Sequence, residues 1–224
     1  MAKHSKRYRA LKEKVESGKA YSLDQALELL KEAGNTTFDA GVEIHVKIGI
    51  DVKQSDQQVR GTVSLPHGTG KKQRIAALTA KPADAKSAGA ALAGGEELIK
   101  EIQTGKIDFD VLVAEPAFMA KLAPVAKILG PRGLMPSPKN GTVAPDIAKA
   151  IEELSKGKIS FKNDNTGNIH LLVGRTSFPV EKLKENIQTT FDVIKASKPA
   201  ASKGTFIKNT TLATTMGPGI KVVF

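Results

Sequence analysis

Two different hydrophobic patterns follow one another along this chain, and their order constrains the fold more than any other feature. Residues 42–50 and 59–65 alternate apolar with polar side chains, which is typical of antiparallel strands that bury one face. Residues 74–114 alternate short apolar segments with helical stretches, which is typical of a parallel sheet covered by helices on both faces. Short strands return at residues 159–161 and 169–173, joined by a polar turn. The economical explanation is one domain built from both chain ends, with a second domain inserted into it.

We therefore predict a mixed α/β protein of two domains. A discontinuous α+β domain takes residues 1–67 and 159–224, and an inserted three-layer α/β/α, Rossmann-like domain takes residues 68–158. Glycine-bearing connectors near His67 and Lys158 are the hinge candidates, because glycine tolerates the backbone angles that such crossings need. We expect the two connectors to lie close together in space.

Helix signals are clear at several places. Ser22 and Gln25 have the spacing of a capping box, which predicts an amphipathic helix from there to Gly34. Pro116 is suited to the first position of a helix, and Pro124 should kink or split the stretch that follows.

The segment of residues 205–219 is the first candidate for a binding site. A Thr-rich strand leads into a run of small hydroxyl side chains, and Gly217-Pro218-Gly219 then forces a tight turn in which glycine permits positive φ. No Asp or Glu follows Asp192, while five lysines do, and Lys208 is the one we expect to meet a phosphate. Such a basic field suits a polyanion, although a C-terminal hairpin with solvated lysines fits the composition equally well.

The composition limits the classes of function. The net charge of +11 favours nucleic acid or an anionic surface as the partner. The absence of cysteine excludes disulfides, thiolate zinc sites and cysteine nucleophiles, and it fits a reducing compartment. The four histidines lack metal-ligand spacing, and neither a membrane span nor a signal peptide is evident. We expect a soluble cytoplasmic protein without a metal or another cofactor.

A second basic candidate is the Gly- and Pro-rich loop of residues 130–141. It lies inside residues 116–145, which contain no acid, and its candidate residues are Lys127, Arg132 and Lys139. A rigid loop with fixed basic side chains can contact an RNA backbone, and we expect this one to serve tRNA or accessory contacts. The alternative is a stiff connector that crosses the edge of the sheet.

An enzyme is the rival class of function. The sequence GTGK at residues 68–71 suggests a phosphate loop, but Leu65 stands where the first glycine belongs and Lys72 replaces Ser or Thr. The chain also lacks GxGxxG and any carboxylate–histidine set within one loop. A nucleotide-dependent α/β enzyme therefore stays an alternative, and we predict no enzymatic activity.

Motifs at six separated places carry a resemblance to a known family. They are FD at 38–39, GID at 49–51, RGTVSLPHG at 60–68, LGPRGLMP at 129–136, FKNDNTG at 161–167 with His170, and TTMGP at 214–218. Over essentially its whole length, the chain resembles the bacterial family of the first large-subunit ribosomal protein, the protein of the mobile ribosomal stalk.

The resemblance implies a partner and a function. Members bind a folded segment of large-subunit rRNA in the stalk beside the tRNA exit site, contact exit-site tRNA, and repress translation of their own messenger through a site that mimics the rRNA one. The resemblance therefore implies a ribosomal protein that assists movement and release of deacylated tRNA, and we expect a monomer away from the ribosome. A free RNA-binding repressor or chaperone is a further alternative.

The resemblance also implies which residues bind rRNA. They are Phe38, Glu43 and His45 together with Thr214, Thr215, Met216, Gly217 and Pro218, and a neighbouring turn with Lys162, Asp164, Gly167 and His170. The chain departs from the family at Thr37 and Ala40, where Lys and Glu are common. Because the chain has only eight Phe, two Tyr and no Trp, we expect recognition of RNA shape through sugar and phosphate groups instead of base stacking.

Overall fold

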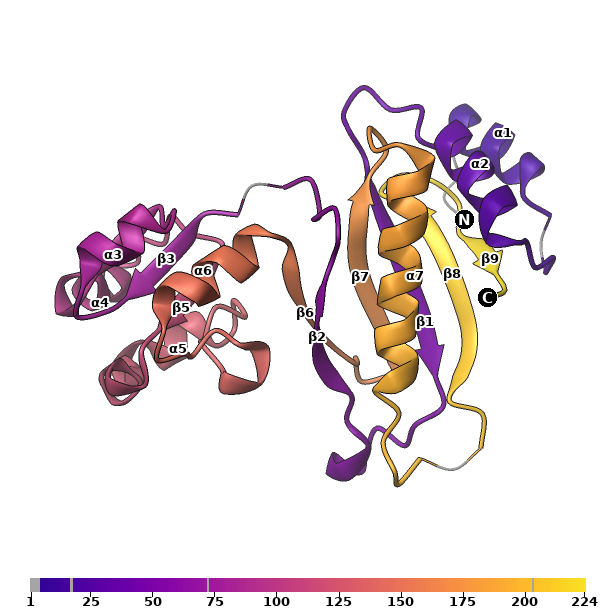
Figure 1. Cartoon of the computed structure of the whole chain (residues 1–224). Helices are drawn as coiled ribbons and strands as arrows, with labels where there is room; N and C mark the ends of the chain where they lie inside the picture. Colours follow the sequence, from indigo (N-terminus) through magenta and orange to yellow (C-terminus); the bar gives the residue numbers. More distant parts are fainter. Residues whose placement is uncertain (1–4, 17, 72, 203) are drawn as a thin grey trace. The chain divides into compact units, whose positions relative to one another are not determined.

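The computed structural model describes residues 5–16, 18–71, 73–202 and 204–224, so residues 1–4 of the basic N-terminus lie outside the described part. The chain divides into two compact units (Figure 1). Unit 1 comprises Met1–Gly70 and Ser160–Phe224, and unit 2 comprises Lys71–Ile159. Both units combine helices and strands, which confirms the mixed α/β class.

Unit 1 is built on a four-stranded antiparallel sheet with the order β7-β1-β8-β9. Its strands are β1 (Gly41–Ile48), β7 (Asn168–Arg175), β8 (Ile207–Thr214) and β9 (Ile220–Val222). Strand β1 alternates half-buried and buried residues along its whole length, as its sequence predicts. Because β1 comes from the first part of the chain and both its neighbours from the second, neither part completes this sheet alone.

Two helices cover one face of this sheet (Figure 1). They are α2 (Leu23–Ala33) and α7 (Val180–Ala196), and a further helix, α1 (Lys6–Lys14), buries none of its residues. The predicted capping box starts α2, since Ser22 Oγ accepts from the Gln25 N–H at 3.5 Å and Gln25 Oε1 accepts from the Ser22 N–H at 3.4 Å. The helices bury apolar side chains such as Leu27 and Ile187 against the inner face of the sheet, which holds the core of unit 1.

A separate two-stranded sheet pairs β2 (Arg60–Ser64) with β6 (Lys158–Lys162), and a 3₁₀ turn, η1 (Ser55–Gln57), precedes β2. The polar turn of residues 163–167 therefore joins strands of two different sheets. The start of the turn is held to the segment before β2, since Asn163 Oδ1 accepts from the Val59 N–H at 2.8 Å.

The first crossing between the units lies three residues later than the boundary predicted at His67, and the second one residue later than that at Lys158. The buried side chain of Asn186 explains the first difference, because it holds the segment after β2 against α7. Asn186 Oδ1 accepts from the His67 N–H at 3.2 Å, and Asn186 Nδ2 donates to the Gly68 carbonyl at 3.0 Å. Those residues are thereby part of unit 1.

Unit 2 contains a three-stranded parallel sheet with the order β4-β3-β5. Its strands are β3 (Ile75–Leu78), β4 (Leu92–Gly94) and β5 (Val111–Ala114). The sequence analysis does not predict β4, because three residues are too few to show a period.

Helices cover both faces of the parallel sheet. They are α3 (Pro82–Ser87), α4 (Glu96–Gln103), α5 (Ala126–Leu129) and α6 (Ile147–Ser155), with 3₁₀ turns η2 (Pro116–Phe118), η3 (Ala120–Val125) and η4 (Pro138–Asn140). Ile75 and Ala77 belong to a core with α3 and α6, while Ala76 and Leu78 belong to a core with α4, η3 and α5. Among the described residues, no helix combines the length and the apolarity that a bilayer crossing needs.

The stretch after β5 is broken, as predicted. It forms the 3₁₀ turns η2 and η3, and α5 begins only at Ala126. Pro124 lies inside η3 and has no N–H to donate, so a continuous α-helix cannot pass through it.

Candidate nucleic-acid interface

The sheet face that α2 and α7 leave uncovered carries mainly polar side chains. We call it the open face, and it comprises Glu43, His45 and Lys47 of β1, Asn168, His170 and Leu172 of β7, Asn209, Thr211 and Ala213 of β8, and Lys221 of β9. All of these residues are half-exposed or exposed. The predicted residues Glu43, His45 and His170 thus share one surface of unit 1.

Two histidines contact each other at the centre of the open face. His45 pairs with His170 across β1 and β7, and their Nδ1 atoms lie 2.8 Å apart. Burial lowers the pKa of His45, and the adjacent His170 lowers it further, although Glu43 at 3.7 Å opposes both effects. On the other side, Asp164 Oδ2 lies 3.7 Å from His170 Nε2. Within the described part of the chain, no three acidic or His side chains converge as metal ligands.

The turn of residues 163–167 is held by its own carboxylate. Asp164 accepts from the N–H of Asn168 at 2.7 Å and from the N–H and hydroxyl of Thr166 at 2.9 and 2.7 Å. These bonds hold the pKa of Asp164 well below its ordinary value. Gly167 has φ +76°, and its carbonyl accepts from the Ile48 N–H at 2.9 Å, which docks the turn on β1. Asp164 and Gly167 therefore shape the turn, while Lys162 beside it is exposed.

Only some of the predicted rRNA-binding residues in the turn of residues 214–218 are exposed to solvent. Thr214 is 5% exposed and faces the interior, and Pro218 is buried too. Gly217 is required by close approach, because a Cβ there would stand 2.2 Å from Thr214 Oγ1. The expected use of positive φ is wrong for this turn, since neither Gly217 nor Gly219 has it. The side chains that reach solvent are those of Thr215 and Met216, the latter 56% exposed.

Arg7 of α1 holds the tip of this turn from outside. Its guanidinium donates to the Met216 carbonyl at 2.9 Å and to the Asn35 carbonyl at 3.1 Å. From the inside, Thr215 Oγ1 accepts from the Gly41 N–H at 2.9 Å, and the Thr215 N–H donates to the Gly41 carbonyl at 3.0 Å. The turn is therefore positioned between α1 and the start of β1.

Phe38 is exposed to solvent, and the next residue, Asp39, fixes its backbone segment. The Phe38 side chain is 50% exposed, three residues before Gly41, which contacts the turn of residues 214–218. Asp39 fixes the segment because its carboxylate accepts from the hydroxyls of Thr176 and Ser177 at 3.0 and 2.9 Å. Partial desolvation raises the pKa of Asp39, but the hydrogen bonds from Ser177 outweigh it, and the pKa lies below its ordinary value.

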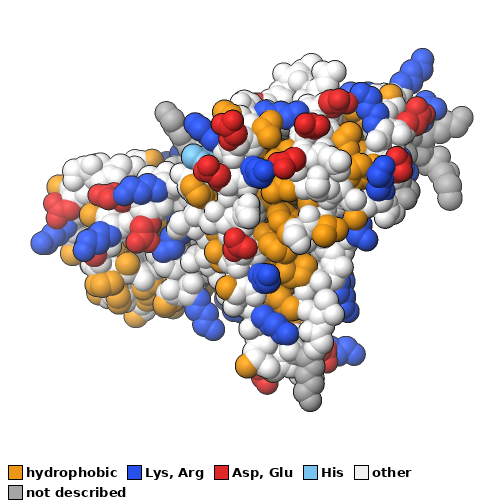
Figure 2. All heavy atoms as spheres, turned by 45° about the vertical axis from the view of Figure 1, so that its right-hand side comes forward, with side chains coloured by type: hydrophobic (Ala, Val, Ile, Leu, Met, Phe, Trp, Pro, Cys, Tyr) orange, Lys and Arg blue, Asp and Glu red, His pale blue; other side chains and the backbone are white. Residues whose placement is uncertain are grey.

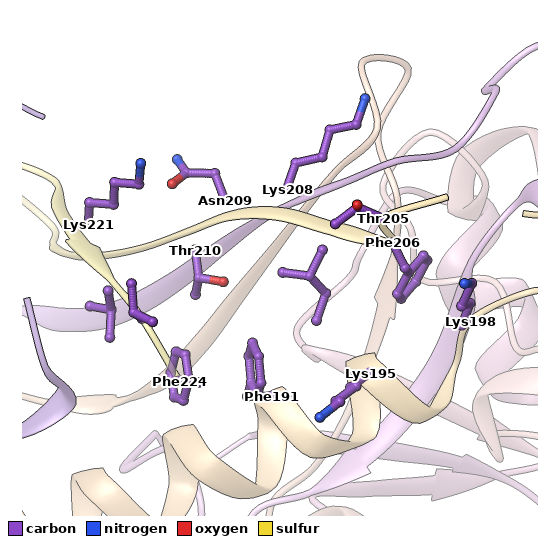
Figure 3. A pocket seen from close by; sticks show the side chains of 13 residues that line it. Phe191, Lys195, Lys198, Thr205, Phe206, Lys208, Asn209, Thr210, Lys221 and Phe224 are labelled. Atoms are coloured by element: carbon purple, nitrogen blue, oxygen red, sulfur yellow. The ribbon is translucent and has the colours of Figure 1, made fainter. Parts of the chain in front are cut away.

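Lys208 points to the same side as Asn209 because β8 is irregular there. Lys47 pairs with Asn209 and Ile48 with Ile207, which leaves Lys208 as the extra residue of a β-bulge. Figure 3 shows the Lys208 and Asn209 side chains directed away from α7, the helix that carries Phe191. The bulge thus adds a lysine to the edge of the open face.

The basic loop of unit 2 is ordered by hydrogen bonds of its own backbone. The Leu134 N–H donates to the Leu129 carbonyl at 3.0 Å, and Thr142 Oγ1 accepts from the Ser137 N–H at 2.8 Å. The three predicted basic side chains are exposed on three successive elements of this stretch, namely α5, the next turn and η4; they are Lys127, Arg132 and Lys139. They lie in unit 2 and are not part of the open face.

Comparison of the sequence with known proteins shows which family the chain belongs to. A sequence profile described as the Ribosomal protein L1p/L10e family matches residues 29–218. A protein of Mycoplasma capricolum subsp. capricolum, named Large ribosomal subunit protein uL1, is 51% identical over 226 residues, which cover 100% of both chains. The chain belongs to the ribosomal protein L1p/L10e family. Proteins of the same name from Kosmotoga olearia and Thermus thermophilus are 50% and 49% identical, over 99% of this chain and 97% and 98% of theirs.

Membership of the L1p/L10e family confirms the resemblance that the motifs carry. The structure also shows positioning residues that the motifs do not include. Lys47 donates from Nζ to the Thr166 carbonyl, and the alternation of residues 42–50 already places it beside His45. Arg7 has no such signal, because its contact with Met216 spans 209 positions of the chain.

Proposed function

We propose that this chain is a component of the large ribosomal subunit, in the cytoplasm, and binds the folded rRNA of the mobile stalk beside the tRNA exit site. Its membership of the L1p/L10e family and the name of its relatives, Large ribosomal subunit protein uL1, support the proposal. The main structural support for the proposal is the open face, together with the turn of residues 214–218, which directly follows β8. Discontinuous parts of the chain build this face, and most of its outward side chains are polar.

RNA is read on this surface through sugars and phosphates. His45, His170 and Thr215 offer donors and acceptors for 2′-hydroxyl groups, and Lys47 and Lys208 offer charge for phosphates. Phe38 and Met216 are the exposed apolar side chains, and they pack on sugars or on an unstacked base. Glu43 and Asp164 keep the two histidine rings in place, so their main task is positioning.

Salt-dependent binding tests the rRNA site. A Lys208→Ala variant should bind a stalk rRNA fragment less tightly, with a salt slope smaller by about one unit, because one phosphate contact is lost. Lys182→Ala is the matched control, since Lys182 is an exposed lysine of α7 and lies off the open face. Equal slopes for the parent chain and both variants would remove Lys208 from the site.

We further propose that unit 2 is an inserted three-layer α/β/α, Rossmann-like domain that contacts exit-site tRNA and assists movement and release of deacylated tRNA. The exposed Lys127, Arg132 and Lys139 on an ordered loop support this assignment. A double variant, Arg132→Ala with Lys139→Ala, should keep the affinity for stalk rRNA and weaken tRNA binding to the reconstituted subunit. A large loss of rRNA affinity would place these residues in the rRNA site instead.

Repression of the chain's own messenger would use the same open face, because one surface that reads RNA shape can bind two RNAs of similar fold. A messenger leader fragment should therefore compete with the stalk rRNA fragment, and Lys208→Ala should weaken both. We propose no enzymatic activity for this chain, since the recognised features all belong to RNA binding and the phosphate-loop fingerprint is incomplete.

A further inference from the structure

A groove in unit 1 adjoins the open face, with which it shares Lys208, Asn209 and Lys221. It has a volume of about 480 Å³ and is bounded by the C-terminal half of α7, by β8 and β9, and by the last residues of the chain. Figure 3 shows the Phe191 and Phe224 side chains meeting at its floor and Lys195 at its helical wall. The space-filling view of Figure 2 shows hydrophobic side chains reaching the surface in a band, with charged side chains beside it.

The floor of the groove is apolar and partly open to solvent. Phe191 and Phe224 stack with ring centroids 4.0 Å apart and an interplanar angle of 10°. Phe224 is still 42% exposed, and the adjacent Val223 is 62% exposed. Phe206 and Val222 also line the groove. Exposed apolar side chains that adjoin one another in a groove indicate a binding site.

The rim of the groove has a single sign of charge. None of the thirteen lining residues is acidic, and four are lysines. Lys195 and Lys198 lie at the rim, while the side chains of Lys208 and Lys221 point away from α7, toward the open face (Figure 3). Lys198 donates to the Gly204 carbonyl at 3.2 Å, which keeps its charge at this rim. A partner that covers the apolar floor must therefore bring negative charge to the rim.

We propose that this groove binds an acidic peptide segment of a protein partner, anchored by a large apolar side chain between α7 and β8. A peptide fits better than RNA, because Phe191 and Phe224 stack on each other and leave no space for a base between the two rings. β8 already lies between β1 and β9 in the sheet, so side chains carry the recognition and an added strand does not. The proposal does not rest on the proposed rRNA function, although the groove adjoins the open face.

Fluorescence anisotropy with the full chain tests the proposal. The probe is a labelled ten-residue peptide in which Asp alternates with Leu and Phe, and two matched peptides replace either the apolar anchors by Ser or the acids by Lys. The first peptide should bind saturably and the other two much more weakly. Saturable binding of the Ser peptide at equal affinity would overturn the apolar anchor.

Substitutions in the groove test where on the protein the peptide binds. Lys195→Glu should weaken binding by about threefold to tenfold, since a rim attraction becomes a repulsion. Phe224→Ala should also weaken it, with only a small drop in melting temperature, because Phe224 lies beyond β9 and its main loss is the stacking on Phe191. Lys182→Glu, an equal charge change elsewhere on α7, should leave binding unchanged. An equal loss for both lysine variants would show mere charge attraction and overturn the site.

Two competition arms separate this site from the RNA surface. Saturating stalk rRNA should leave the peptide bound, and displacement would place the peptide on the open face and overturn the proposal. An oligouridine should not compete for the groove. Oligouridine binding that Lys195→Glu weakens, with no saturable peptide binding, would make the groove a nucleic-acid site instead.

Discussion

The Thr215 hydroxyl sits where the fold and the proposed RNA site meet. It accepts from the Gly41 N–H at 2.9 Å and donates to the Gly41 carbonyl at 3.4 Å, while the residue itself is exposed. Thr215→Val should cost ~0.5–1.5 kcal/mol of unfolding free energy and lower rRNA affinity by about twofold to tenfold. The salt slope should stay the same, because no charge is lost.

Thr215→Ser is the control for this prediction, since it keeps the hydroxyl and should restore both quantities. Chemical denaturation gives the stability and filter binding gives the affinity. A Val variant that loses stability but binds rRNA like the parent chain would assign the hydroxyl to the fold alone.

The histidine pair makes stability depend on pH. The lowered pKa of His45 means that the unfolded chain, with a histidine pKa of about 6.5, takes up the proton first as the pH falls. The contribution of His45 is therefore complete above that pKa and is lost as the pH drops through the lower folded value. The facing groups, Glu43 beside His45 and Asp164 beside His170, limit the loss without reversing the lowered pKa of His45.

Urea unfolding at about pH 7.5 and about pH 5.5 measures this effect. The parent chain should lose more stability on acidification than a His45→Asn variant, which has no proton to take up there. His170→Asn should also reduce the loss, because it removes a neighbour that lowers the pKa of His45. An identical pH dependence in the parent chain and in His45→Asn would show that the pair is not the cause.

At the scale of elements, α1 acts as a clamp on the turn of residues 214–218. Arg7 makes that contact through its hydrogen bond to the Met216 carbonyl. Arg7→Ala should lower rRNA affinity more than Arg9→Ala does, since both variants remove one exposed charge but only the first frees the turn. Hydrogen exchange at the Gly217 N–H, which donates to the Thr214 carbonyl, should accelerate in Arg7→Ala alone. Equal effects of the two variants would reduce Arg7 to a general charge contribution.

At the scale of the whole molecule, the sheet of unit 1 needs both parts of the chain. β1 lies between β7 and β8, so a chain in which a short glycine linker joins Gly70 to Ser160 should fold and bind stalk rRNA. The pairing of β2 with β6 places Ser160 beside the strand that ends six residues before Gly70. Residues 1–70 alone should remain unfolded, because β1 then lacks both neighbours. Circular dichroism and rRNA binding check both chains, and an unfolded linked chain would contradict the prediction.

Local patterns in the sequence determined most elements of this fold. The capping box at Ser22 starts α2, as predicted. Within residues 74–114, where the sequence predicts alternating strands and helices, Glu96–Gln103 forms α4 and Val111–Ala114 is the mostly buried strand β5. These features depend on neighbours within a few positions, so they can be recognised without the fold. The L1p/L10e motifs likewise identify the family, since each is contiguous in the chain.

Only the tertiary structure decided what lies beside what. The contact between His45 and His170 spans 125 positions, and it follows from strand register, which no local pattern encodes. The inward direction of Thr214 and the outward direction of Lys208 depend on where β8 pairs with β1 and where that pairing slips by one residue. Successive side chains of a strand point to opposite faces of the sheet. The sequence can therefore suggest the residues of a site, but the register of strand pairing decides which of them lie on the face that meets the partner.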